Sequence, residues 1–509
     1  MKKIFFFLLI LVLSVTYTKE RYFPYYFPAD PAKAPDYQGV PASTFNVGKY
    51  VLDAPAGKHG FVRARDGHFY FDDGIRAKFW GTNIAFNACF PDKKTAEIMA
   101  NRIAYFGFNA VRLHHMDMLF EPDGIFEDVA PDCKNKQMKP TGHLSPGQLD
   151  KLDYLIFQLK QHGIYIDINT LVSRLFTEAD GVPYAEELSA AGKPVSLFDA
   201  KLIKLQKQYD KDLLTHFNPY TKLRYSDDPA ICLVEINNEN SLTELNPLLL
   251  PKYYQKELNN LTNNGEIPLS ELEKQYLKEM RDYLHNELKV KVPVGMGVKM
   301  PVGMGGNWTS KQLKIQQECL DYIDKHAYWD HPSFPHKKWD MNDFRIKNKS
   351  IFADKNLGII GGSKVNEGES KQSNKPHVVS EWNHCYPNKY AFETPLLIAA
   401  EANKNDWDAL FQFAFSQGGD GNTNYDNIKN YFDINSNAQQ LILCAFGSWI
   451  FLRDGDTALK IEVTENCATV LIKKYNITVK VGKIKNTYSG WDANGKFRWG
   501  TSPTLMEKQ

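Results

Sequence analysis

The sequence predicts an α/β fold, a (β/α)8 barrel with a β-rich lead-in before it and a small antiparallel β domain after it. Eight short apolar runs recur between residues 78 and 419, and helical patterns separate most of them. No glycine-rich phosphate fingerprint follows any run, which argues against the alternative of an open doubly wound sheet. From residue 459 onward apolar residues alternate with period two between turn residues, which is typical of antiparallel strands.

The pattern divides the chain into a signal segment (1–19), a β-rich segment packing on the barrel (20–76), the barrel itself (77–435) and a C-terminal helix with a small β domain (436–509). In the second part, "HGFVRARDGHFYF" predicts a hairpin that turns at Asp66–Gly67. The expected barrel strands lie, in order, in Lys78–Phe86, Phe108–Asp117, Ile164–Val172, Ala230–Asn240, Val292–Val298, Leu320–Tyr328, Lys375–Asn383 and Leu410–Gly419. Residues 346–374, rich in Gly, Ser, Lys and Asn, indicate an exposed loop over the carboxyl face of the barrel.

Charge and composition narrow the possible partners. The 509 residues include 61 Lys and Arg against 60 Asp and Glu, a formal charge of +1. This balance gives no electrostatic reason to expect nucleic acid or an anionic membrane as partner. The aromatic share of 13% suits a surface on which sugars stack, although core packing is the simpler interpretation of any single ring.

The first residues have the order of a secretory signal. Two lysines precede an apolar run from Ile4 to Leu13, and small and polar residues follow it. The run is short for a membrane span, and no cysteine marks a lipid attachment site at its end. We therefore expect a secreted or periplasmic protein with no membrane anchor after signal cleavage.

The seven cysteines are scattered, and none has the spacing of a zinc site. Cys232 and Cys444 lie in apolar runs and are most simply buried free thiols. No structural metal and no cofactor is expected.

Polar residues gather where the expected strands end, which is where barrels carry catalytic groups. Glu239 and Glu381 each end a strand and are 381 − 239 = 142 residues apart, so they could face each other across the barrel mouth. The other candidates at strand ends are Arg112, His114, His115, Asp117, Asn169, Asn238, His326 and Tyr328. A single glutamate at such a position is more simply a salt bridge, but the whole set favours a site.

Two facing carboxylates are what glycoside hydrolysis needs. One is protonated and gives its proton to the leaving oxygen, while the other is ionised and attacks the anomeric carbon. Arg112 and Tyr328 would keep one carboxylate charged, and Asn238 could bind a sugar hydroxyl.

The segment "NPYTKLRYSDDPAICLVEINNEN" resembles the fourth-strand region of clan A glycoside hydrolases, particularly family 5. This resemblance implies that Glu239 is the general acid/base, that Asn238 binds the 2-hydroxyl, and that Glu235 is structural. "VVSEWN" is similar to the seventh strand of the family and implies that Glu381 is the nucleophile.

Two further segments extend the resemblance over residues 76–448. "KHAYW" is similar to the sixth strand and implies His326 and Tyr328 as substrate-binding residues, and "FNAVRLHHMD" is similar to the second strand and implies Arg112.

The sequence also departs from the family. Asn240 stands where the family usually has proline. Asn169 replaces a site histidine, and His114 or His115 would fill that space. The expected eighth strand lacks the usual tryptophan, so the sugar platform would come from one of three aromatic residues: Phe413, Phe415 and Trp382.

The expected function is a secreted retaining β-glycosidase that needs no metal and acts on an oligo- or polysaccharide, with β-mannan first and β-glucan next. The alternatives are a β-galactosidase-type enzyme of the clan and a carbohydrate-binding barrel without turnover. A metal-dependent hydrolase is set aside because His114 and His115 are adjacent and should point to opposite faces of a strand. Endo and exo action are both open.

Overall fold

The computed structural model describes residues 27–36, 41–119, 121–127, 141–243, 245–298, 307–348, 350–351, 374–419, 425, 428, 430–453, 459–463, 467–472 and 477–482. The expected signal segment and most of the expected loop at 346–374 lie outside these residues.

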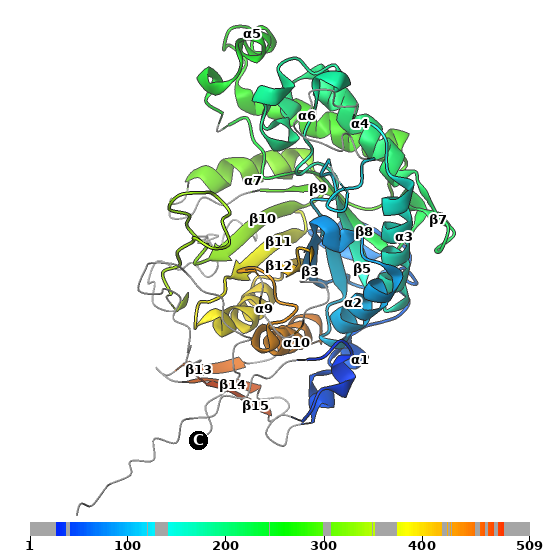
Figure 1. Ribbon diagram of the computed structural model, residues 1–509, viewed down its shortest axis with the longest axis vertical. Coiled ribbons are helices and arrows are strands. Elements are labelled where there is room, and N and C mark those ends of the chain that lie inside the picture. The colour runs from blue at the N-terminus through cyan, green and yellow to red at the C-terminus, as the bar shows by residue number, and fades with distance from the viewer. Residues whose placement is uncertain are drawn as a thin grey trace, which may run out of the picture.

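One parallel sheet of eight strands forms the centre of the molecule (Figure 1). Its strands, in chain order, are β3 (Phe79–Ala85), β4 (Ala110–His114), β5 (Tyr165–Asn169), β8 (Ile231–Asn238), β9 (Val294–Gly297), β10 (Ile323–Trp329), β11 (His377–His384) and β12 (Ala409–Ser416). The order in the sheet is β10-β11-β12-β3-β4-β5-β8-β9. Seven of these strands are buried along their whole length, and β10 along most of it, because helices cover the outside and side chains fill the inside.

The two edge strands meet and close the sheet. The Asp321 N–H donates to the Val294 carbonyl at 3.0 Å, and the His326 N–H donates to the Val298 carbonyl at 3.0 Å. These bonds join β9 to β10 and confirm the (β/α)8 barrel, so the alternative of an open doubly wound sheet is excluded.

Helices surround the barrel (Figure 1). They are α2 (Lys93–Tyr105), α3 (Pro146–Gln161), α4 (Ala200–Leu214), α5 (Lys252–Leu261), α6 (Leu269–Asp282, extended by a π-turn over Tyr283–Glu287), α7 (Asn307–Cys319), α9 (Thr394–Lys404) and α10 (Ala438–Arg453), with the short α1 (Gly48–Val51) before them. Asp92, Ser145 and Asp199 begin three of these helices by accepting the N–H of the residue three positions on.

The helix α10 packs on the barrel. The Ser448 hydroxyl donates to the Gly107 carbonyl at 2.5 Å, and the rings of Phe451 and Trp80 lie 6.0 Å apart. Since α10 follows the eighth strand, it completes the helical layer, although the expected domain boundary at residue 436 precedes it. The sheet of β13 (Leu459–Val463), β14 (Cys467–Ile472) and β15 (Ile477–Gly482) is antiparallel, as its period-two pattern predicts.

A hairpin covers the amino-terminal end of the barrel. β1 (Val62–Arg65) and β2 (His68–Phe71) pair across Asp66 and Gly67, whose φ angles of 52° and 79° suit a two-residue turn. Phe69 packs against Phe79 and Tyr322, with ring centroids 6.4 and 5.7 Å away. Because Phe79 begins β3 and Tyr322 precedes β10, the hairpin fills the bottom of the barrel.

The segment Asn218–Pro229, which precedes β8, has a structural role. Asn218 donates through Nδ2 to the Asp153 carbonyl at 3.0 Å, and Tyr225 donates to Asp153 Oδ1 at 2.7 Å. Asp228 pairs with Lys160 at 2.7 Å. Asp153 and Lys160 belong to α3, so these residues bind α3 to the start of β8. A short hairpin of β6 (Phe217–Asn218) and β7 (Leu223–Arg224) lies at the start of this segment.

Cys232 and Cys444 are buried free thiols, as expected, and Cys89, Cys319 and Cys385 are as well. Among the helices that the structure describes, none combines the length and the apolar character that a membrane crossing requires.

The packing of β9 gives a test of barrel closure. A Cβ at Gly295 would lie 2.0 Å from Cζ of Tyr322, whereas a Cβ at Gly142 would meet nothing within 4 Å. We expect Gly295→Ala to lower the free energy of unfolding by about 1–3 kcal/mol or more, because the ring and strand must both shift. Gly142→Ala is the matched control and should change it little. Equal stability of both variants in denaturant titration would contradict this account of β9.

Candidate active site

Four barrel strands end in a non-glycine residue with left-handed backbone. These residues are Phe86 after β3, His115 after β4, Glu239 after β8 and Asp330 after β10, with φ angles of 56°, 54°, 45° and 50°. Such angles are uncommon for non-glycine residues and cluster at functional sites. The carboxyl face is therefore where the backbone departs from regular strand geometry.

Glu239 lies at this face with a partly open side chain. Its N–H donates to the Gly297 carbonyl at 2.9 Å, which fixes the turn at the end of β8. Its side chain is 27% exposed, whereas that of Glu381 is 7% exposed. The two glutamates thus differ in their access to water.

Glu381 on β11 is surrounded by donors. Its Oε1 accepts from Arg112 Nη1 at 2.8 Å, and its Oε2 accepts from the Tyr328 hydroxyl at 2.8 Å. His114 Nε2 lies 3.3 Å from Oε1, and His326 Nδ1 lies 3.3 Å from Oε2. Charge-assisted hydrogen bonds of this kind fix the position of the carboxyl group.

Arg112 on β4 is fully buried and connects the strands around it. Its Nε and Nη2 donate to the two oxygens of Glu235 at 2.9 and 2.6 Å. It also donates to Asn83 Oδ1 at 2.9 Å and to Asn238 Oδ1 at 3.0 Å, in addition to Glu381. Burial alone lowers the pKa of Arg112, but the charges of Glu235 and Glu381 outweigh it and raise that pKa. The cation therefore stays charged in the interior.

His326 on β10 lies between the two glutamates. Its Nδ1 is 2.7 Å from Glu239 Oε1, and its Nε2 is 3.1 Å from the Ser380 hydroxyl. Burial lowers the pKa of His326, but the charges of Glu381 and Glu239 prevail and raise it to about 9. At neutral pH the ring is a cation that donates to Glu239.

The structure brings six of the predicted residues together at this end of the barrel: Arg112, Asn238, Glu239, His326, Tyr328 and Glu381. The inferred structural role of Glu235 agrees with its bidentate bond to Arg112.

Asn169 was expected to contact substrate, but it is fully buried and its amide donates to Glu235 Oε2. It therefore helps to hold Glu235 in place and does not line the opening.

His115 and His114 also differ from expectation. The His115 ring stacks on Phe86 at 4.3 Å and bonds through Nδ1 to the Ser173 hydroxyl. Burial lowers the pKa of His115 to about 3, so the ring is neutral. The prediction that the two histidines point to opposite faces is wrong: their ring centroids lie 4.2 Å apart. The left-handed backbone at His115 interrupts the alternation of an extended strand.

Trp382 does not form a sugar platform. It is fully buried and packs against Trp80 at 5.7 Å, because Glu381 points into the barrel and its neighbour must point out. Phe415 is buried in the same core cluster. Phe413 is the remaining candidate, with ring centroids 5.8 Å from His114 and 6.3 Å from Tyr328.

Two supporting residues were not predicted. Asn83 on β3 accepts from Arg112 and donates to the Ser380 carbonyl at 3.0 Å. The Ser380 hydroxyl accepts from His326 Nε2, and the Ser380 N–H donates to Asp324 Oδ1 at 2.9 Å. The signal in both cases is a polar residue inside an apolar strand run. Burial and the charge of Glu235 raise the pKa of Asp324 to about 7.

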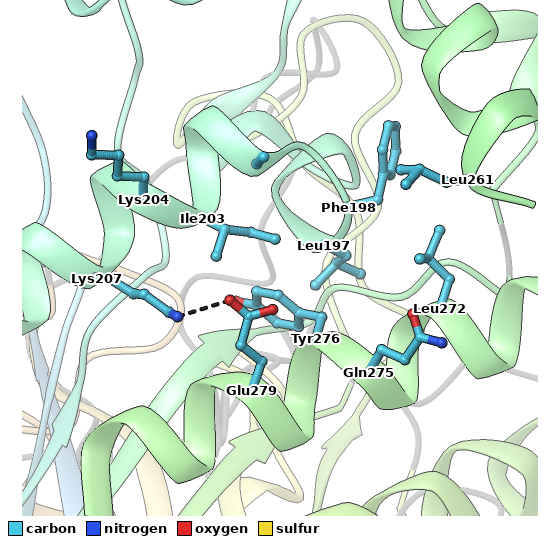
Figure 2. A pocket seen from close by; sticks show the side chains of 11 residues that line it. Leu197, Phe198, Ile203, Lys204, Lys207, Leu261, Leu272, Gln275, Tyr276 and Glu279 are labelled. Atoms are coloured by element: carbon cyan, nitrogen blue, oxygen red, sulfur yellow. Dashed lines mark hydrogen bonds and ion pairs between the residues drawn. The ribbon is translucent and has the colours of Figure 1, made fainter. Parts of the chain in front are cut away.

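A pocket of about 410 Å³ lies away from these residues, among helices outside the barrel (Figure 2). Its walls come mainly from α4 and α6, including Ile203, Leu272 and Tyr276. Lys207 and Glu279 form an ion pair of 2.8 Å at its edge. None of its lining residues belongs to a barrel strand, so it is separate from the carboxylate pair.

Glu239, His326 and Glu381 also have donor atoms within 4.8 Å of one another, which is close enough for a metal ion. A protonated His326 cannot ligate a cation through Nδ1, and Arg112 at 2.8 Å from Glu381 opposes added positive charge. The set therefore fits acid–base chemistry better than metal binding.

This fold and site define a barrel protein with a carboxylate pair at the carboxyl mouth. The fold is similar to that of an endo-β-1,4-mannanase from Thermotoga petrophila, with a TM-score of 0.52 and 15% identity over 78% of this chain and 80% of that one. An endo-1,4-β-mannanase from Rhizomucor miehei gives a TM-score of 0.51 and 14% identity over 76% of this chain and 98% of the other. At these low identities the similarity to the two mannanases is one of fold.

A sequence match points the same way. A 105-residue stretch is 31% identical to mannan endo-1,4-β-mannosidase 7 of Arabidopsis thaliana, and it covers 19% of this chain and 24% of that protein. The chain thus matches about a quarter of the length of this relative. No protein-family model matches the chain.

The environment of His326 predicts a distinct titration. In the folded chain its ring should lose its proton near pH 9, against 6.5 for an ordinary histidine. Because the folded pKa is raised, the stability it contributes is fully present below about pH 6.5 and is lost as the pH rises through about 9. Ring-proton NMR measures this pKa directly.

We expect Glu239→Gln to lower the pKa of His326, since it removes one of the carboxylate charges that raise it. Glu287→Gln, at an exposed position after α6, is the control and should leave it unchanged. A pKa at or below 6.5 in the wild-type chain would refute the bridging geometry.

Proposed function

We propose that the protein is a retaining β-glycoside hydrolase that uses Glu381 as nucleophile and Glu239 as general acid/base. The observation that carries the proposal is the pair itself: oxygen atoms of the two carboxylates lie within 4.8 Å of each other. Retaining enzymes hold their carboxyl groups about 5–5.5 Å apart, whereas inverting ones need about 6.5–9.5 Å to admit a water.

The two environments suit the two roles. Arg112 and Tyr328 each donate to one oxygen of Glu381, which fixes the orientation of the proposed nucleophile. Glu239 is more exposed and is hydrogen-bonded to His326, so it can exchange a proton with a leaving oxygen and later with water. For the first step Glu239 must hold a proton, which His326 Nδ1 can supply from 2.7 Å away. Glu381 then attacks the anomeric carbon while Glu239 protonates the leaving oxygen. Water then attacks the glycosyl ester as Glu239 takes its proton.

Asn238 is the proposed sugar-binding neighbour. Its Oδ1 accepts from Arg112, which fixes the orientation of the amide. The structure gives its Nδ2 no hydrogen bond to any residue it describes, so this group is available to donate to a sugar hydroxyl beside the reacting carbon.

A β-mannan is the first candidate substrate, and β-glucan is the next. Support comes from the similar proteins, which are named as mannanases and a mannan mannosidase. The sequence phrase around Asn218–Pro229 adds little to this choice because its side chains bind α3 to β8, at the end of the strand away from Glu239. A β-galactosidase-type activity is a less favoured alternative.

The proposed protein is secreted or periplasmic, because residues 1–19 have the order of a signal segment. Its partner is an oligo- or polysaccharide, with no nucleic acid and no membrane anchor after cleavage. The proposed reaction needs no metal or organic cofactor.

A panel of aryl β-glycosides and of mannan, glucan and galactan polymers tests the proposal. We expect Glu239→Gln to reduce kcat on the best substrate by about 10²–10⁴-fold, since it removes the proton donor. Glu381→Gln should reduce it at least as much, and Glu287→Gln should not. Near wild-type turnover in Glu381→Gln would end the double-displacement mechanism.

A 2-fluoro glycoside of the preferred sugar separates retention from inversion. It should add the mass of one glycosyl group to the intact protein, at Glu381 by peptide mapping. If wild type hydrolyses a substrate but gives the product of opposite configuration by NMR, the enzyme inverts. If it binds glycans and hydrolyses none, the alternative of a carbohydrate-binding barrel holds.

Chelation tests the metal alternative at the same site. Prolonged dialysis against EDTA should leave kcat unchanged, because protonated His326 and Arg112 take the place of a cation beside the glutamates. A loss of activity that added divalent metal restores would instead assign Glu239, His326 and Glu381 as ligands.

A further inference from the structure

The segment 330–348 follows β10, the strand that carries His326 and Tyr328, and it holds an exposed tryptophan. Trp339 is 51% exposed, and its φ angle is 65°. The left-handed region is a strained conformation for so large a side chain and is kept only where surrounding structure enforces it. Strain at an exposed aromatic residue near a catalytic pair is a reason to look for a bound ligand.

A short chain of rings joins this tryptophan to the nucleophile. The ring centroids of Trp339 and His331 are 5.7 Å apart, and those of His331 and Tyr328 are 5.4 Å apart. The Tyr328 hydroxyl in turn donates to Glu381 at 2.8 Å. Two ring contacts therefore separate Trp339 from a residue that touches the proposed nucleophile.

The segment is fastened at both ends, so the ring is held in place before any ligand arrives. Asp330 accepts the N–H groups of Lys347 and Asn348 through its two oxygens, each at 2.7 Å. Ser333 and Arg345 exchange two backbone hydrogen bonds of 2.9 and 2.8 Å. A preorganised surface loses little conformational freedom when it binds.

Apolar surface and polar groups lie side by side around Trp339. Phe334 packs beside the indole with centroids 5.2 Å apart, and Lys338 Nζ lies 5.3 Å from its centroid. The indole N–H makes no hydrogen bond to a residue within the described ranges. A pyranose ring matches this surface, because it has C–H faces that pack on an aromatic ring and hydroxyl edges that accept from N–H donors.

We propose that Trp339 is a stacking platform for a pyranose ring of a β-linked glycan, at a unit beyond the one held by the carboxylate pair. This inference rests on the proposed function for its substrate class. It implies that the protein binds several sugar units of a chain at once, and it supplies an aromatic contact apart from the eighth strand, whose expected tryptophan is missing.

Two substrates of different length test the platform in the full-length protein. We expect Trp339→Ala to lower kcat/KM on the preferred oligo- or polysaccharide by about tenfold, as is typical for the loss of a central aromatic anchor. On an aryl glycoside of one sugar, kcat/KM should change less than about twofold. Trp339→Tyr should restore part of the loss. The control is Tyr50→Ala. Tyr50 is 48% exposed and belongs to α1, which packs against the end of α2 at the bottom of the barrel. This variant should change kcat/KM on neither substrate.

Equal loss on both substrates, or no loss on the longer one, would overturn the proposal. Binding is measured separately by retardation in gels that contain mannan or glucan, and Trp339→Ala should weaken it. If the wild type hydrolyses nothing, the proposed function fails, and the retardation still decides whether Trp339 binds sugar. If Trp339→Ala changes only the oligomeric state, the residue belongs to a protein interface and the platform is refuted.

Discussion

Arg112 carries its positive charge in the barrel interior, where an unpaired ion would be strongly destabilising, so the surrounding strands must supply partners for it. Glu235 provides two oxygens, and Asn83, Asn238 and Glu381 provide one each. Because these partners come from β3, β8 and β11, the guanidinium sets the relative position of strands that are distant in the chain. The proposed nucleophile is thus oriented by the same group that the core requires.

The charge arrangement extends outward from this centre. On one side of Glu381, Arg112 forms an ion pair with Glu235, and both residues are fully buried. On the other side, His326 forms an ion pair with Glu239. Two cations therefore stand among three carboxylates, and the most exposed carboxylate is the one proposed to move protons. At the opposite end the hairpin of β1 and β2 packs into the bottom of the barrel, away from the carboxylate pair.

The barrel was predictable because its strands are nearly continuous apolar runs and helical patterns separate most of them. The glutamates, Arg112, His326 and Tyr328 were predictable because each ends such a run. Asn83 and Ser380 were missed since one polar residue inside a strand carries no sign of its partner across the sheet. Trp382 was misplaced because neighbouring residues of a strand point to opposite faces. Since Glu381 points into the barrel, Trp382 points out of it. His115 was misplaced because a single left-handed residue is not visible in a pattern of residue types.

The left-handed residues at the strand ends lower the stability of the fold. They are Phe86, His115, Glu239 and Asp330. Each left-handed residue at a strand end holds conformational energy of about 1–3 kcal/mol that a glycine would release. Replacement by glycine would also remove a ring, a carboxylate or a loop anchor from the barrel mouth. Sequences selected only for thermal stability should therefore drift toward glycine at these four positions, and those selected for turnover should not. The backbone at the carboxyl face is thus less stable than it could be, in exchange for the side chains that the reaction needs.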